Sequence, residues 1–145
     1  MYDPFQYNIK SWLTAIFKVT LLKYEMIKND YNYIGLTESN HNWRNMKEQE
    51  QLHTQTGGWW RNKKIHKSWL KTKDRETWQQ GGTILVATNN ITSHIEGSRE
   101  DERQLGQWSW ITMGDPTRTI HTMIITLYYP CTHIGTHTVF TQQIE

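Results

Sequence analysis

A single carboxylate, Glu38, stands where a buried strand would deliver it to the rim of a sheet. The apolar run YIGLT at residues 33–37 precedes it, and polar Ser39 and Asn40 follow at once. A carboxylate in that position can bind a hard cation such as magnesium, which takes oxygen ligands and keeps several waters. The pattern also fits a solvated acid or a helix cap, so Glu38 alone does not decide the chemistry.

Three other segments also carry a polar or glycine residue beside a predicted strand. They are residues 5–9 with Asn8, residues 80–87 with Gly81 and Gly82, and residues 123–131 with Tyr128. Asn8 precedes Glu38 by thirty positions, which leaves room for a helix between the two strands. The first forty residues therefore predict a β-α-β unit.

Taken in order, these segments resemble the first half of an endonuclease/exonuclease/phosphatase domain of deoxyribonuclease-I-like fold, especially the branch attached to reverse transcriptases in retroelements. Asn8, Glu38 and Tyr128 fall on the positions of the family's strand-end Asn, its metal-binding Glu and its active-site Tyr. The resemblance implies magnesium held by Glu38 and Asn8, a phosphate contact from Tyr128, and a DNA substrate. It extends over nearly the whole chain and includes the strand at residues 105–110.

The departures from the family pattern concern the catalytic machinery. Lys10 and Ser11 stand where the family usually has Gly, and basic Lys10 replaces a position that is often acidic. The family's later Gly-Asp-x-Asn strand end and its terminal Asp-His pair have no counterpart. Residues 114–117 read Gly-Asp-Pro-Thr, but proline and aspartate at this point predict a hairpin turn. We therefore expect this polypeptide to be inactive, or nearly so, on its own.

The implied fold is α+β: a partial four-layer α/β-sandwich with mostly antiparallel sheets that lacks its C-terminal strands. A helix is predicted over residues 12–29, with an apolar face directed at one sheet. That face comprises Leu13, Ile16, Phe17, Leu21, Tyr24 and Ile27. A short helix is predicted near residues 46–52 and another over 136–143. Strands are predicted at 83–87, 94–96, 107–113 and 119–127, the last of them central, with a loop over 98–103.

The composition fits one truncated domain over residues 1–145. Only 36% of the chain is hydrophobic, and its aromatic content comes mainly from eight Trp and seven Tyr. This aliphatic content is thin for a self-contained core and favours a domain that is missing strands. The single Cys131 cannot form an internal disulfide, which indicates a reducing compartment. With no signal peptide or membrane span, the sequence predicts a soluble protein of the cytoplasm or nucleus.

A basic tract over residues 59–75 interleaves tryptophans with cations. Seven basic residues and one acid lie within residues 61–75, whereas the whole chain has a net charge of +2. Such a composition suits phosphate neutralisation and stacking on bases. The predicted nucleic-acid contacts are Asn40, Arg61, Lys63, Lys64 and Lys67. The alternative is a helix whose Trp60 and Trp69 fill the core while its lysines face water.

These observations predict the N-terminal half of a magnesium-dependent DNA endonuclease of a retroelement, with a reverse transcriptase region as a possible downstream partner. Three alternatives stay open. The chain could be a non-enzymatic fragment that binds nucleic acid through the tract, or a relic without function. A phosphatase acting on a phospholipid or nucleotide fits the same fold, because fold does not fix substrate.

Overall fold

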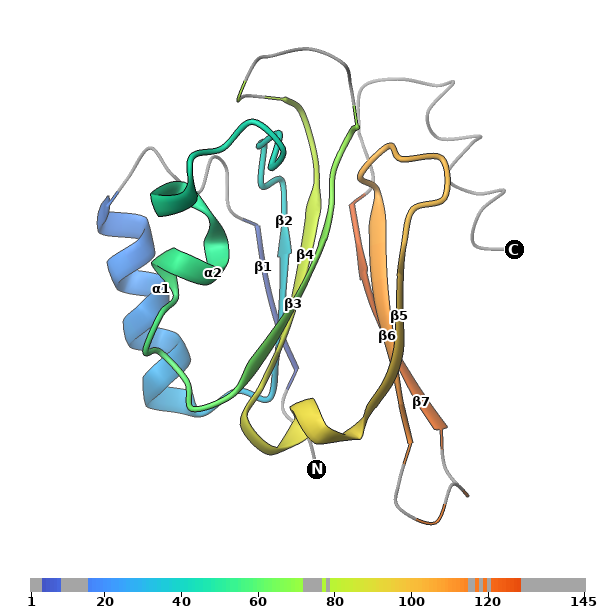
Figure 1. The fold of residues 1–145 in the computed structure, drawn as a ribbon. Helices are drawn as coiled ribbons and strands as arrows, with labels where there is room; N and C mark the ends of the chain where they lie inside the picture. The colour runs from blue at the N-terminus through green and yellow to red at the C-terminus, as the bar shows by residue number, and fades with distance from the viewer. Residues whose placement is uncertain are drawn as a thin grey trace.

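The computed structural model describes residues 4–8, 16–71, 77, 79–114, 117, 119 and 121–128, with side chains described from residue 19 onward. Two β-sheets pack face to face, and helices cover the outer side of one of them (Figure 1). The architecture is α+β with few helices, as the sequence predicts. Within the described residues no helix is long and apolar enough to cross a membrane.

The first sheet has the strand order β1-β2-β4-β3. Its members are β1 (Pro4–Asn8), β2 (Tyr33–Thr37), β3 (Lys63–Ser68) and β4 (Thr83–Thr88). β1 runs parallel to β2, and β4 is antiparallel to both β2 and β3. Helix α1 (Ile16–Asn29) connects β1 to β2, so the predicted β-α-β unit is confirmed. The expected helix start at residue 12 lies outside the described residues.

The second sheet is an antiparallel meander in the order β5-β6-β7. Its strands are β5 (Ile95–Glu100), β6 (Trp108–Gly114) and β7 (His121–Leu127). β6 and β7 pair from Trp108↔Leu127 to Gly114↔His121, which confirms that a hairpin joins them. Residues 115 and 116 of the predicted turn lie outside the described residues. Two predictions for this sheet are wrong. β6 rather than β7 is central among the described strands, and β5 continues to Glu100 where a loop was expected from residue 98.

Two clusters of buried side chains lie on the two faces of the first sheet. Ile34, Leu36, Ile84 and Val86 point toward the helices, together with Leu22 and Met26 of α1. Tyr33, Leu85 and Ala87, the alternate residues of β2 and β4, pack against Ile111 and Met113 of β6. This alternation follows from the two-residue period of a strand. β2 and β4, which are buried on both faces, are therefore apolar at successive positions and carry threonines only at their ends.

The apolar face predicted for α1 is displaced by one residue in its described part. Leu22 is 6% and Met26 0% exposed, whereas the predicted core residues Leu21, Tyr24 and Ile27 are 47–59% exposed. Leu22 and Met26 are four apart and stack on one side of the helix. The helix carries apolar residues on nearly all sides, so periodicity alone does not select the face that meets the sheet.

The helix considered for the basic tract is also wrong. Residues 63–68 form β3, which pairs residue by residue with β4 from Lys63↔Thr88 to Ser68↔Thr83. β4 is fully buried and needs hydrogen-bonding partners on both sides. Pairing with β4 therefore outweighs the helical propensity of a lysine-rich segment. The short helix predicted near residues 46–52 corresponds to η2 (Glu48–Glu50) and α2 (Leu52–Gln55).

The remaining elements are connections. The 3-10 helix η3 (Asn89–His94) leads from β4 in the first sheet to β5 in the second. Leu70, beyond the end of β3, forms an antiparallel bridge with Leu105 in the β5–β6 loop. Lys10, Ser11, Cys131 and the helix predicted at 136–143 lie outside the described residues.

Candidate functional site

The strand ends predicted to carry chemistry meet at one edge of the first sheet. β1 and β2 are parallel, and Asn8 pairs with Thr37 in their register, so Asn8 and Glu38 lie at the same end. β4 is antiparallel to β2 and begins at that end, directly after Gly81 and Gly82. We call residues 38–42 and 79–82, together with Tyr128, the rim. The backbone alone places Asn8 beside it.

Hydrogen bonds hold the two loop segments of the rim together. Asn40 donates its backbone N–H to the Gly81 carbonyl (2.8 Å) and accepts a bond from the Gln79 N–H (3.1 Å). The side-chain Oδ1 of Asn40 accepts a further bond from the Gly81 N–H (2.9 Å). Asn40, predicted as a nucleic-acid contact, therefore uses its amide oxygen to fix the loop before β4.

Glu38 occupies a strained backbone position at the centre of the rim. Its φ is 57°, in the left-handed region that non-glycine residues seldom adopt. The side chain is half-buried, and its carboxylate makes no hydrogen bond or ion pair with the residues that the structure describes. Strain of this kind persists where the surroundings enforce it, and it concentrates at functional sites. The carboxylate is therefore available to a ligand.

The two glycines are required by the close approach of their neighbours. Both have positive φ, +87° at Gly81 and +92° at Gly82. A Cβ on Gly82 would lie 2.4 Å from Ser39 Oγ, and one on Gly81 would lie 3.0 Å from the Tyr128 ring. Tyr128 thus packs its ring directly against the loop that leads into β4.

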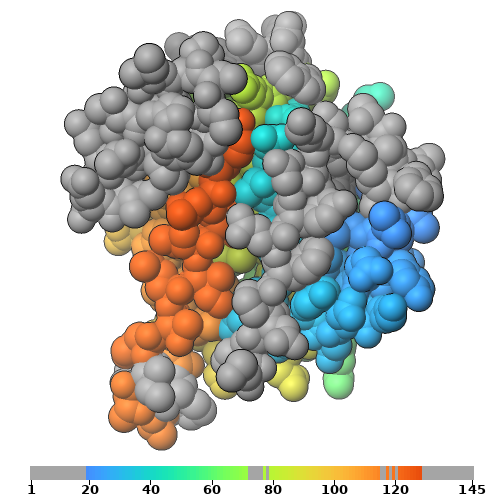
Figure 2. Space-filling view, turned by 180° about the vertical axis from the view of Figure 1, so that it is seen from behind, coloured from blue at the N-terminus to red at the C-terminus, as the bar shows by residue number. Residues whose placement is uncertain are grey.

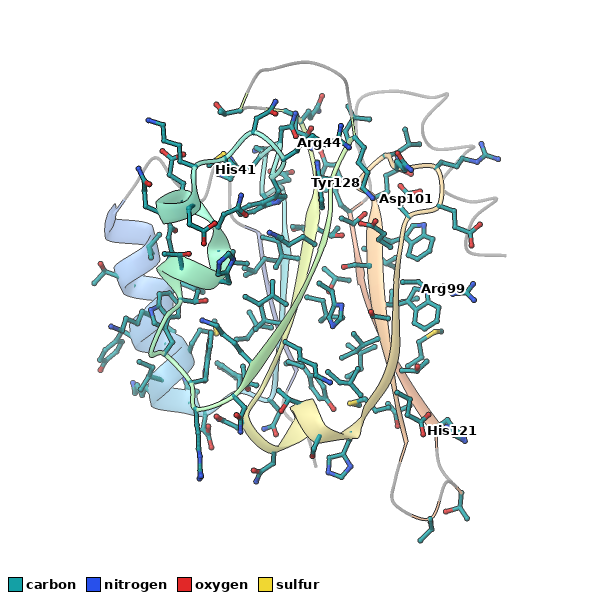
Figure 3. The ribbon with its side chains drawn as sticks, viewed as in Figure 1. His41, Arg44, Arg99, Asp101, His121 and Tyr128 are labelled. Carbon is teal, nitrogen blue, oxygen red and sulfur yellow. The ribbon has the colours of Figure 1, made fainter. Side chains whose placement is uncertain are left out.

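Tyr128 joins the second sheet to the rim. Its backbone N–H donates to the Gln107 carbonyl (2.7 Å) just beyond the last β6–β7 pair. In Figure 3, Tyr128, His41 and Asp101 lie toward one end of the two sheets and His121 toward the other. The residues near 40, near 80 and near 128 also adjoin on the face drawn in Figure 2. The three predicted catalytic positions therefore converge from β1, β2 and β7.

Asp101 organises the loop that supports Tyr128, a role that no sequence pattern indicated. Its carboxylate is 1% exposed and accepts backbone N–H bonds from Arg103, Leu105 and Gln107 at 2.9–3.2 Å. Such bonds to backbone N–H groups are how a buried carboxylate is satisfied. Asp101 thereby fixes the position of Gln107, whose carbonyl holds Tyr128.

Several buried polar atoms at the rim have no protein partner within the described part of the chain. They are Ser39 Oγ, His41 Nε2, both amide atoms of Gln79, and Gln107 Oε1 nearby. Burial lowers the pKa of His41 below its usual value, and the Glu50 carboxylate opposes that shift. A neutral imidazole and free amide oxygens are groups that a water or a ligand would satisfy. Sequence reasoning missed these residues, whose only signal is polar character next to strand ends.

The rim partly fits a magnesium ion. Glu38 supplies a carboxylate, and the free amide oxygens of Gln79 and Gln107 are further hard donors in the same region. Magnesium is commonly bound through one or two carboxylates while it keeps several waters. No group of three His, Cys, Asp or Glu residues capable of holding a metal occurs among the residues the structure covers. Glu38 is thus the one carboxylate that the described rim offers to such an ion.

The predicted nucleic-acid contacts of the basic tract divide into two pairs. Lys63 Nζ donates to the His53 and Thr56 carbonyls at 3.0 and 2.6 Å, and Lys67 Nζ donates to Gln51 Oε1 at 3.1 Å. Burial lowers the pKa of both lysines. They point toward α2, whereas Arg61 and Lys64 are exposed.

The tryptophans of the tract contribute to the core rather than to an open stacking surface. Trp59 is 8% exposed, and Trp60 and Trp69 are half-buried against the same cluster under the helices. Lys67 Nζ lies 4.8 Å from the centre of the buried Trp43 ring. Of the four predicted basic contacts, only the two exposed cations therefore remain available to a phosphate backbone.

The chain matches no protein-family model and no curated protein.

Proposed function

We propose that this chain is the N-terminal half of a magnesium-dependent, phosphodiester-cleaving endonuclease domain of deoxyribonuclease-I-like fold, of the kind found in retroelements. The observation that carries the proposal is the convergence of Asn8, Glu38 and Tyr128 at one edge of two packed sheets. These residues come from three strands far apart in the sequence. In the proposed four-layer sandwich, the second half of the domain adds the remaining strands and the outer helices of the second sheet.

Several residues in the rim or beside it have a role in this proposal. Glu38 holds the magnesium ion, Asn8 supplies an orienting amide near the ion, and Tyr128 contacts the phosphate. The ion neutralises the charge that develops on the phosphate during cleavage. Asn40 and Asp101 act indirectly, because they fix the Gly81 loop and the support of Tyr128. Gly81 leaves the space that the tyrosine ring fills.

The chain does not carry the complete machinery. It has no Asp-His pair to activate water and no Gly-Asp-x-Asn strand end to orient the nucleophile. Residues of a catalytic set act as a unit, so removal of one part abolishes most of the activity. We therefore expect the 145-residue chain alone to be inactive or nearly so, with DNA cleavage requiring the second half of the domain. A downstream reverse transcriptase region is the proposed partner.

The test is a nicking assay on supercoiled plasmid, with magnesium or with chelator. The chain alone leaves the plasmid supercoiled. When it is joined to the C-terminal half of a retroelement endonuclease of this family, we expect magnesium-dependent nicking that Glu38→Ala abolishes. Glu102→Ala serves as the matched control, because Glu102 is an exposed acid outside the rim whose ion pair with Arg99 is long and exposed. Retained nicking by the Glu38 variant would contradict the proposal.

The same samples test the alternatives. A non-enzymatic binding fragment would bind the plasmid without cleaving it and without needing magnesium. Its binding would weaken as the salt concentration rises and when Arg61 and Lys64 are replaced by neutral residues. A relic would neither bind nor cleave. Release of phosphate from a phospholipid or nucleotide, without plasmid nicking, would indicate a phosphatase of the same fold.

A further inference from the structure

β7 is an edge strand whose side chains resemble those of a central strand. It pairs with β6 on one side, and within the described residues no strand pairs with its other side. Figure 2 shows it in orange along the surface of the molecule. Met123 is 58% and Ile125 38% exposed, although both are large and apolar. An unpaired apolar edge is a template for another strand.

The opposite edge of the same sheet is protected. β5 carries a register irregularity between Ile95 and Gly97, and its residues include Glu96, Arg99 and Glu100. Bulges and charges are the devices that keep edge strands from pairing with other chains. Residues 121–127 of β7 contain no Lys, Arg, Asp, Glu or Pro. One edge of this sheet is therefore closed to pairing, and the other is open.

The single titratable residue of β7 is engaged within its own sheet. His121 Nδ1 lies 3.1 Å from Glu96 Oε2, across the central strand. Gly114, the partner of His121 in the register, makes room for this contact, because a Cβ there would clash with the Glu96 carboxylate. The rest of β7 is electrically neutral. Two identical strands would therefore meet without like-charge repulsion.

We propose that β7 pairs antiparallel with β7 of a second copy of this chain, so that the second sheet continues through a two-fold dimer. A two-fold axis perpendicular to the sheet places outward-facing residues opposite outward-facing residues. Ile124 and Thr126 face inward, since Thr126 is buried and Ile124 packs against the inner cluster, so Met123 and Ile125 face outward. The register centred on Ile124 then places Met123 opposite Ile125 of the second copy, which makes two apolar cross-strand pairs.

This inference does not depend on the proposed endonuclease function. It rests on the neutral, exposed edge of β7 and on the alternation of its side chains between the inner and the outer face of the sheet. The other occupant to consider is the strand that a second half of the domain would add at this edge. Such a strand would compete with the second copy, so the assay uses the 145-residue chain by itself.

Sedimentation velocity over a range of concentrations tests the dimer. We expect a species of twice the 17.4 kDa chain mass that dissociates on dilution. Ile125→Lys buries a charge opposite Met123 of the second copy and places the two like-charged lysines diagonally across the seam, so it should yield the monomer. Ser98→Lys, which adds the same charge to exposed β5, should leave the dimer intact. A monomer at every concentration, or equal behaviour of the two variants, would overturn the proposal.

A cross-linking experiment keeps the test decisive even if Ile125→Lys fails to fold. On a Cys131→Ser background, Met123→Cys and Ile125→Cys chains are mixed under mild oxidation. The proposed register places the two cysteines opposite each other only in the mixed dimer, at a spacing that a disulfide can bridge. We expect disulfide-linked dimers in the mixture and almost none in either variant alone. Equal cross-linking in all three samples, or none in the mixture, would overturn the register.

Discussion

The two sheets share a common inner layer but differ in what covers their outer faces. On the first sheet, Ile34, Leu36, Ile84 and Val86 are buried beneath Leu22 and Met26 of α1. On the second, no described helix lies over β6 and β7, and Met123 and Ile125 are exposed (Figure 1). The first sheet has the layer that a half-buried strand surface requires. Within the described residues, the outer face of the second sheet is therefore the less covered of the two.

The rim is likewise built from two parts, one supplied by each sheet. The first sheet contributes Glu38, the Gly81 loop and the hydrogen bonds of Asn40. The second sheet contributes Tyr128, whose position depends on the Gln107 carbonyl and, through it, on Asp101. The geometry of the rim therefore depends on how firmly the second sheet is joined to the first.

Truncation of one outward residue in each sheet should show the largest difference. Ile84 is 0% exposed beneath the helices, so Ile84→Ala should lower the free energy of unfolding by about 2–5 kcal/mol. Ile125 is 38% exposed, and Ile125→Ala should lower it by about 0.5 kcal/mol. Urea unfolding at a concentration that keeps the chain monomeric measures both. Similar losses would mean that the outer face of the second sheet is covered after all.

A smaller effect should come from the junction between the sheets. Gly106 has a φ of +72°, and a Cβ there would lie 2.7 Å from Trp69 Cα and 2.9 Å from the Leu70 nitrogen. Gly106→Ala should therefore push the β5–β6 loop away from the end of β3. We expect it to lower the free energy of unfolding by about 2–3 kcal/mol. Gly58 has a similar φ of +75°, but a Cβ there would have no atom within 4 Å, so Gly58→Ala isolates the backbone cost of about 1 kcal/mol. Equal losses in thermal or urea unfolding would show that the close contact at Gly106 is unimportant.

Strands were predictable from the sequence where an apolar run and flanking turn residues mark them. Prediction failed where a segment becomes a strand only because it pairs with a buried neighbour. The β-α-β unit, β4 and the β6–β7 hairpin follow from apolar runs and turn residues. β3 could not be predicted, because its lysines favour no strand until the buried β4 supplies a partner. The orientation of α1 was likewise ambiguous, because both Leu21 and Leu22 lie on plausible apolar stripes.

The candidate positions could be named from the sequence, but not the hydrogen bonds around them. Asn8, Glu38 and Tyr128 were chosen through a family resemblance, and the register and contacts place them near one edge, while their functional roles stay a prediction. The roles of Asn40 and Asp101 arise from hydrogen bonds to backbone groups up to forty-one positions away. Such bonds leave no local pattern, since any Asn or Asp can accept a backbone N–H.

The smallest predicted effect is a pH dependence from two half-buried or buried histidines of the first sheet and its rim, His41 and His66. Burial lowers the pKa of His41 at the rim, and burial together with the Lys64 charge lowers the pKa of His66 on β3. The unfolded chain therefore takes up protons near the ordinary value of 6.5 while the folded chain does not. As pH falls from about 7.5 to about 5.5, through that ordinary His value, the free energy of unfolding should decrease. Urea unfolding at both pH values should show a flatter dependence for the His41→Gln, His66→Gln double variant. An unchanged slope in the double variant would place the titrating groups elsewhere.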